Sequence, residues 1–232
     1  EMQRSLVGSE MCIRDSGNTG LHFDYLLFDA CFMSSIEALY DLRGCADRII
    51  ASPCEVMAAG FNYTDILPHL LADAGTSYDL PGVCSEYYDY YMNRATTKSG
   101  CIALTVTGEL EPLAAIVKEI ETKYPGKTYD RASLQTYEGL DEHVFYDLQG
   151  YIEAICDEKD PLLDKFRAQM GKAFPTESRL HTPSFYSVYG LGDAPNGMHT
   201  IEDGKYSGVT TSAPCERFAP EWAQTSWYRA TH

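Results

Sequence analysis

One stretch near the amino end decides the fold, and it reads Phe23-Asp24-Tyr25-Leu26-Leu27-Phe28-Asp29-Ala30-Cys31. Its apolar residues are denser than simple alternation would give, which predicts a strand covered on both faces of a sheet. The next residues, Ser34-Ser35-Ile36-Glu37, form a capping-box pattern that predicts the start of a helix. A buried strand that runs into a helix is the basic unit of an α/β fold.

The rest of the chain continues this alternation. Strands are predicted at 48–52, 100–106, 184–189 and 206–212, and helices at 64–74, 82–95, 109–123, 141–157, 160–173 and 220–229. Residues 124–138 are polar and aperiodic, which is typical of a surface loop. Strands that alternate with helices predict a mostly parallel central sheet covered on both faces.

Composition limits the possible partners. The chain has 232 residues, of which 44% are apolar, and 18 basic against 34 acidic residues give a net charge of 18 − 34 = −16. Such a chain has enough apolar material for one folded domain. Its negative charge repels phosphate backbones, so we expect no nucleic-acid partner. No apolar run reaches the roughly 18–20 residues of a membrane-spanning helix, so no transmembrane segment is predicted.

Cys31 occupies a special position among the eight cysteines. It follows the carboxyl end of the predicted strand and precedes a helix amino terminus, where N–H groups and the helix dipole favour a thiolate. Such a thiol can act as a nucleophile, or it can simply fill space at a strand–helix turn. No two cysteines have Cys-x-x-Cys spacing, so no metal site or redox dithiol is predicted. Most of the other cysteines are expected to be small buried hydrophobic residues.

The string from Phe28 to Ala38, FDACFMSSIEA, resembles the nucleophile region of the clostripain family of cysteine peptidases. Further similarity follows at Ala51-Ser52, at Phe145-Tyr146-Asp147-Leu148 and at Tyr206-Ser207-Gly208-Val209-Thr210. The resemblance implies a caspase-like α/β/α sandwich and a Cys–His catalytic dyad. In that dyad Cys31 attacks the scissile carbonyl and forms a thioester, which water then hydrolyses.

The resemblance also implies a substrate pocket for a basic side chain. Asp29 matches the family acid that helps select Arg or Lys before the cleaved bond, although a turn or capping role is the alternative. A second family acid corresponds to Asn62 in Gly60-Phe61-Asn62-Tyr63, which carries no charge. That difference weakens the expectation of strict basic specificity, and Glu55 is the candidate to compensate.

The resemblance places the general base in a His-Gly motif upstream of the nucleophile strand, about 50 residues before the cysteine in the related caspase signature. Only thirty residues precede Cys31, and Ser5–Ser16 resemble translated sequencing-adapter read-through. We therefore expect 1–16 to be non-native and 17–232 to be the carboxyl-side portion of a peptidase domain, inactive alone because amino-terminal strands and the base are missing. His22 begins the strand that ends near Cys31, so it should lie at the opposite edge of the sheet from the cysteine. None of the remaining histidines is assigned as base: His69, His143, His181, His199 and His232.

The resemblance implies a peptide or protein substrate, no required cofactor, and calcium only as a property of some family members. It also implies an extracytoplasmic location, secreted or in the cell envelope, with a lipid anchor in the longer protein. The main alternative is a non-catalytic surface protein that uses the same scaffold to bind a peptide or another partner.

Overall fold

The computed structural model describes residues 20–71, 77–189 and 195–232. The proposed non-native segment 1–16 lies outside these residues, as do positions 72–74 of one predicted helix. Within the described part of the chain, no helix is both long and apolar enough to cross a membrane.

A four-stranded sheet forms the centre of the molecule. Its order is β1 (Phe23–Leu27), β2 (Ala46–Ala51), β3 (Cys101–Val106) and β5 (Arg179–His181). The first three strands coincide with the apolar runs of the sequence, whereas β5 was not predicted. β1 and β2 are parallel, and they end at the same edge of the sheet.

The expectation of a mostly parallel sheet is wrong for the described strands, because β3 is antiparallel to both β2 and β5. The reason lies in the connection between β2 and β3. It contains two helices, α3 (Tyr63–Leu70) and α4 (Leu80–Asp89), and they contact each other. Two successive helices return the chain to the end of the sheet that it left, so the next strand runs in the opposite direction.

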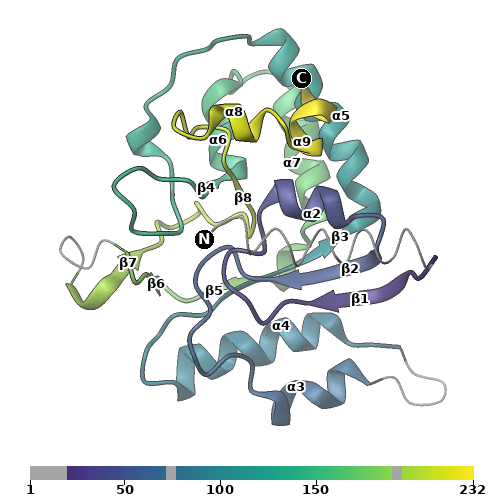
Figure 1. Cartoon of the computed structure of the whole chain (residues 1–232), viewed down its shortest axis with the longest axis vertical. Helices are drawn as coiled ribbons and strands as arrows, with labels where there is room; N and C mark the ends of the chain where they lie inside the picture. The colour runs from purple at the N-terminus through teal and green to yellow at the C-terminus, as the bar shows by residue number, and fades with distance from the viewer. Residues whose placement is uncertain (1–19, 72–76, 190–194) are drawn as a thin grey trace.

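Helices cover both faces of this sheet, which confirms the α/β/α sandwich (Figure 1). Below the sheet in the figure, α3 and α4 pack on Ile50, Ile102 and Leu104. Ile49 and Ala51 point to the opposite face and join a larger core. The helices around this larger core are α2 (Ile36–Leu42), α5 (Leu110–Lys123), α6 (Leu148–Ile155), α7 (Pro161–Ala173) and α9 (Ser226–Thr231).

The carboxyl-terminal half forms two small two-stranded sheets. β4 (Tyr146–Asp147) pairs with β8 (Thr210–Thr211), and β6 (Ser184–Tyr186) pairs with β7 (Met198–Thr200). The strands predicted at 184–189 and 206–212 are therefore shorter than expected and belong to different sheets. The last predicted helix is also divided, into α8 (Ala219–Trp222) and α9.

The helix predicted at 141–157 begins later than the sequence suggested. Only Leu148–Ile155 is helical, with Asp147 as its N-cap, and residues 138–145 form an irregular loop. This loop lies close to the nucleophile region, as described below.

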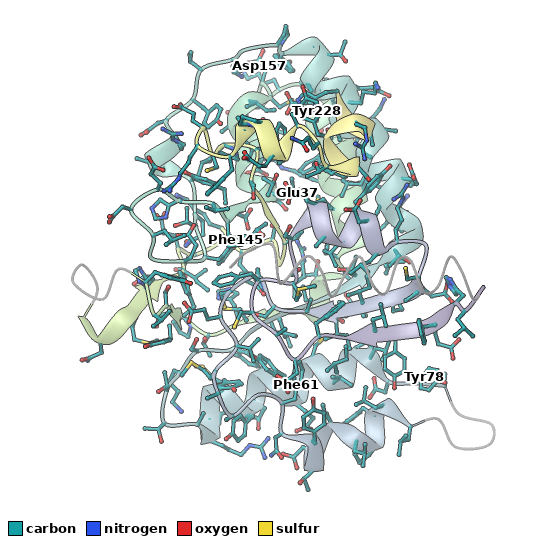
Figure 2. The ribbon with its side chains drawn as sticks, viewed as in Figure 1. Glu37, Phe61, Tyr78, Phe145, Asp157 and Tyr228 are labelled. Carbon is teal, nitrogen blue, oxygen red and sulfur yellow. The ribbon has the colours of Figure 1, made fainter. Side chains whose placement is uncertain are left out.

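The predicted capping box at the start of α2 does not form. Ser35 is the N-cap but makes no side-chain capping bond, and its hydroxyl donates to Glu37. The buried Glu37 carboxylate, labelled in Figure 2, instead accepts hydrogen bonds from the carboxyl-terminal part of the chain. The donors are Thr211 Oγ1 at 2.8 Å, Ser212 N at 3.0 Å and Trp222 Nε1 at 2.9 Å. Glu37 therefore fixes the helix that follows Cys31 to residues some 175 positions away.

Candidate active site

Cys31 is the exposed cysteine in the described part of the chain. It lies in the loop after β1, where Phe28 N still donates to Ile50 O at 2.9 Å and continues the pairing with β2. Cys12 lies outside the described residues. The other cysteines of the described residues are buried, which confirms the sequence expectation: Cys45, Cys54, Cys84, Cys101, Cys156 and Cys215.

The loop that carries Cys31 turns across the end of β2. Phe32 N donates to Cys54 O at 3.1 Å, and Ser34 N donates to Ser52 O at 3.0 Å. Phe32 adopts a φ of 60°, which is an unfavourable left-handed conformation for a bulky side chain. This turn lets the chain leave the strand, present Cys31 to solvent and enter α2.

The surroundings of the Cys31 sulfur affect the pKa of its thiol in opposite directions. Val56 N donates to Cys31 Sγ at 3.3 Å, which favours the thiolate. Burial acts in the opposite direction and is reinforced by the Glu55 charge, so the pKa of the Cys31 thiol is raised above its ordinary value. The expected lowering by the helix dipole is therefore wrong. α2 begins only at Ile36, so Cys31 is not the residue that caps the helix or directly precedes its first turn.

Asp29 lies against the segment that follows β2. Tyr63 Oη donates to Asp29 Oδ2 at 3.0 Å, while the carboxylate remains exposed. Gly60 has a φ of +60°, and a Cβ at that position would lie 2.6 Å from Asp29 Oδ2. Glycine is therefore required there by both the backbone conformation and the close approach of the carboxylate.

The structure gives Glu55 and Asn62 partners of their own. Glu55 Oε1 accepts hydrogen bonds from Ser187 Oγ and Val188 N, both at 2.8 Å. Asn62 Nδ2 donates to Asp65 Oδ2 at 2.6 Å. Glu55 thus ties the end of β6 to the segment beside Cys31, and the Asn62 amide group is turned toward the first turn of α3.

Two further residues lie near the site, Phe145, which the sequence indicated only as part of a family match, and Glu138, which the sequence did not indicate. The Phe145 ring stacks on Phe32, with ring centroids 4.6 Å apart and an interplanar angle of 5°. Phe145 is labelled in Figure 2 and belongs to the irregular loop before β4. The Glu138 side chain is buried at the centre of that loop and accepts hydrogen bonds from four of its donors. An acidic residue in the aperiodic stretch Tyr137-Glu138-Gly139-Leu140 was the available signal, but it resembles an ordinary turn.

Each histidine ring contacts groups other than Cys31. His22 Nε2 contacts Asp47 Oδ1 at 2.9 Å at the beginning of β2, which confirms that it lies at the opposite edge from the cysteine. The remaining rings contact Asp79 (from His69), Glu138 (from His143), Thr182 and Tyr206 (from His181), Phe185 (from His199), and Trp222 and Tyr228 (from His232).

No metal cluster accompanies Cys31 in the described residues. No group of three or more His, Cys, Asp or Glu side chains in this part of the chain is arranged to hold an ion. A cavity of about 250 Å³ lies elsewhere, beside β4 and α6, and is lined by residues that include Gln135, Asp147 and Lys205. Beside Cys31, the structure places the exposed Asp29 two residues away.

Comparison with known proteins identifies this arrangement. The model of the clostripain family matches residues 11–189. A clostripain from Bacteroides thetaiotaomicron, solved in complex with the peptide inhibitor BTN-VLTK-AOMK, is 34% identical with a TM-score of 0.82. The similarity covers 95% of this chain and 92% of that one. No curated protein matches the chain.

Two further structures extend the similarity. A secreted C11 cysteine protease from B. thetaiotaomicron, "iotapain", is 34% identical with a TM-score of 0.83, and this chain covers 58% of its length. A cysteine protease from B. fragilis is 26% identical with a TM-score of 0.81, covering 96% of this chain and 91% of that one. The chain belongs to the clostripain family of cysteine proteases.

Proposed function

We propose that this protein is a cysteine endopeptidase in which the Cys31 thiolate attacks the scissile carbonyl. The attack forms a thioester and releases the amine product, and water then hydrolyses the thioester to regenerate the thiol. The observation that carries the proposal is the exposure of Cys31 at the end of β1, with Val56 N directed at its sulfur. Backbone N–H groups of the surrounding turn are suited to hold the developing oxyanion.

The substrate side chain before the cleaved bond is proposed to be lysine or arginine. Asp29 presents an exposed carboxylate that is oriented by Tyr63 and held against Gly60. A carboxylate in this setting pairs with an ammonium or guanidinium group. The peptide letters of the inhibitor bound to the B. thetaiotaomicron clostripain, VLTK, end in lysine. Asn62 and Glu55 are proposed to flank this pocket, Asn62 as a neutral hydrogen-bonding group and Glu55 as a more distant negative charge.

The general base is proposed to be a histidine, as in the Cys–His dyad of the family resemblance. Because the six rings of this chain contact other groups, we assign the base to none of them. Turnover by the 232-residue chain is accordingly expected to be slow, whereas alkylation of Cys31 by a strong electrophile is not. No cofactor is required by the proposed chemistry, and calcium is left as a family property.

An extracytoplasmic location is proposed because two similar structures are described as secreted C11 proteases. A lipid anchor in a longer form of the protein belongs to the same proposal. Detection of the natural protein in the medium or envelope fraction of the source cells would support this location, and detection only in the cytosol would contradict it.

The proposal is tested by alkylation with two matched peptidyl chloromethyl ketones, one ending in lysine and one in norleucine. The two reagents have side chains of similar length, and only lysine carries a charge. We expect the second-order rate constant of alkylation to be larger for the lysine reagent than for the norleucine reagent. Asp29→Asn should lower the ratio of these two rate constants about tenfold or more, because a hydrogen bond to a charged group contributes about 1.5–3 kcal/mol. Asp24→Asn is the control, because Asp24 contacts Tyr78 away from the site. Equal rates for both reagents in the unmodified protein would contradict basic specificity, and no reaction with either would favour the non-catalytic alternative.

A further inference from the structure

The conformation of Phe32 requires support from its surroundings. A non-glycine residue with a φ of 60° has an energetic disadvantage of roughly 1–2 kcal/mol. Rotation about the N–Cα bond of Phe32, which φ describes, sets how the peptide group between Cys31 and Phe32 is oriented relative to the chain that follows. If Phe32 relaxed to a negative φ, the direction in which the chain continues from Cys31 toward Ser34 would change, and with it the fit of the Cys31 turn against Cys54 O and Val56 N. The reactive arrangement therefore depends on whatever holds Phe32 in place.

Two contacts hold Phe32 in the structure. Its backbone N–H donates to Cys54 O at 3.1 Å, and its half-buried ring lies parallel to Phe145 with centroids 4.6 Å apart. Aromatic pairs contribute about 0.5–1.5 kcal/mol beyond the area that they bury. This contribution is comparable to the backbone penalty at Phe32, so the ring contact offsets a large part of that penalty.

Phe145 in turn depends on a buried carboxylate. Its N–H donates to Glu138 Oε1 at 3.1 Å, and its carbonyl accepts from Tyr137 N at 3.0 Å, so the backbone on both sides of the ring is fixed. Glu138 is 1% exposed. Its other donors are Val144 N at 2.8 Å, Leu140 N at 3.0 Å and His143 Nδ1 at 2.8 Å. A buried carboxylate with four donors is well stabilised, and the loop around it has a defined shape without regular secondary structure.

We propose that the Phe32–Phe145 stack, built on the loop around Glu138, holds the Cys31 turn in its reactive conformation. Phe145 and Glu138 are then positioning residues, which act on the reaction through Phe32 and not by contact with substrate. The inference rests on the proposed role of Cys31 as nucleophile. It adds a second support for the turn, contributed by a part of the chain more than a hundred residues away from it.

The test measures alkylation of the full chain by the lysyl chloromethyl ketone, separated into the binding constant KI and the maximal rate kinact. Phe145→Ala is expected to lower kinact about tenfold and to leave KI nearly unchanged, because Asp29 still binds the lysine side chain. Phe145→Tyr keeps an aromatic ring and is expected to restore kinact. Thermal unfolding of each variant verifies that the protein is folded.

A double-mutant cycle distinguishes positioning from a general loss of stability. Phe32→Gly removes both the aromatic ring and the energetic penalty for a positive φ, so the turn no longer needs a stacking contact to keep its conformation. In that background, Phe145→Ala is expected to change kinact less than twofold. An equal tenfold loss in both backgrounds, or no loss in either, would overturn the inference. Glu138→Gln tests the connection between Glu138 and Phe145. It is expected to lower kinact, and the double variant with Phe145→Ala should lose less than the product of the two single losses. Losses that multiply fully would contradict the proposed connection.

Cys31→Ala separates this inference from the function on which it rests. If Cys31→Ala abolishes alkylation while Phe145→Ala leaves kinact unchanged, the positioning inference fails and the nucleophile assignment stands. If Cys31→Ala is alkylated as fast as the unmodified protein, the nucleophile assignment itself fails.

Discussion

Two neighbouring strand ends place cysteines in very different environments. β1 and β2 are parallel and end at the same edge of the sheet, and each is followed within four residues by a cysteine, Cys31 and Cys54. Cys31 is exposed and accepts a hydrogen bond from Val56 N. Cys54 is fully buried, and Ser52 and Glu55 O surround its sulfur.

The difference shows that a strand end alone does not make a nucleophile. What distinguishes Cys31 is the next residue, since the left-handed Phe32 turns the chain outward while its N–H is anchored to Cys54 O. After β2 the chain folds back over Cys54, and the same segment supplies Val56, Gly60 and Tyr63 to the site. One loop therefore carries the thiol, and the other supports it.

The largest expected effect comes from replacing each of these two cysteines by alanine in turn. Cys31→Ala should abolish alkylation by the lysyl reagent and leave the free energy of unfolding nearly unchanged, because the side chain is exposed. Cys54→Ala should leave most of the alkylation and lower the free energy of unfolding by about 1 kcal/mol, the value for removing one buried apolar group. Reagent consumption and urea unfolding measure the two effects, and loss of alkylation in Cys54→Ala with retention in Cys31→Ala would reverse the comparison.

The second effect concerns the close contact between the two loops. Gly60→Ala places a Cβ 2.6 Å from the Asp29 carboxylate and forces alanine into a left-handed conformation. We expect KI for the lysyl reagent to increase several-fold and the free energy of unfolding to fall by about 1–2 kcal/mol. Gly44→Ala is the matched control, since Gly44 has open space around its Cβ position and an ordinary φ. Equal effects of the two substitutions would contradict the contact.

A smaller effect is expected from the hydrogen bond that orients Asp29. Tyr63→Phe removes the hydroxyl that donates to Asp29 Oδ2 and should raise KI for the lysyl reagent about two- to fivefold, the effect of one hydrogen bond in a partly exposed setting. The norleucine reagent should bind unchanged. Tyr78→Phe removes a similar bond, to Asp24, and serves as the control. An equal change for both reagents would show that Tyr63 does not act through the Asp29 charge.

The smallest effect is on the pH dependence of the thiol. The Glu55 charge contributes to the raised pKa of Cys31, and alkylation requires the thiolate. The rate of iodoacetamide alkylation should therefore rise with pH through a midpoint above that of an ordinary cysteine. Glu55→Gln keeps an oxygen that can accept from Ser187 and Val188, but it removes the charge, so the midpoint should move to lower pH. The measurement uses a Cys12→Ser background, and a midpoint that stays or rises would contradict the assignment.

The sequence predicted those parts of the fold that arise from local patterns. Strands form within the predicted apolar runs 23–28 and 100–106, and helices form within the predicted periodic segments 109–123 and 160–173. The relative direction of β3 could not be predicted, because it depends on how two helices pack between the strands. Nor could the start of α6 be predicted, since residues 138–145 obtain their shape from hydrogen bonds to one carboxylate and have no period.

The same distinction applies to the site. Cys31 was found from its place at a strand end, whereas Asp29 came from the family resemblance and Glu55 was the candidate to compensate for the uncharged Asn62. The structure brings Cys31, Asp29 and Glu55 to one edge of the sheet. The role of Val56 could not be predicted, because it acts through its backbone N–H group and not through its side chain. The role of Phe145 could not be predicted either, because its ring contacts Phe32, more than a hundred residues earlier in the sequence. The expected lowering of the Cys31 pKa failed for a similar reason, since it depends on where the first turn of α2 begins.

Peptide mapping by mass spectrometry after reaction with the lysyl chloromethyl ketone identifies the residue that acts as nucleophile. We expect one equivalent of adduct per chain, located on the peptide that contains Cys31, with Cys54 and the other buried cysteines unmodified. An adduct on Cys54, or on any residue in place of Cys31, would contradict the assignment of Cys31 as the nucleophile.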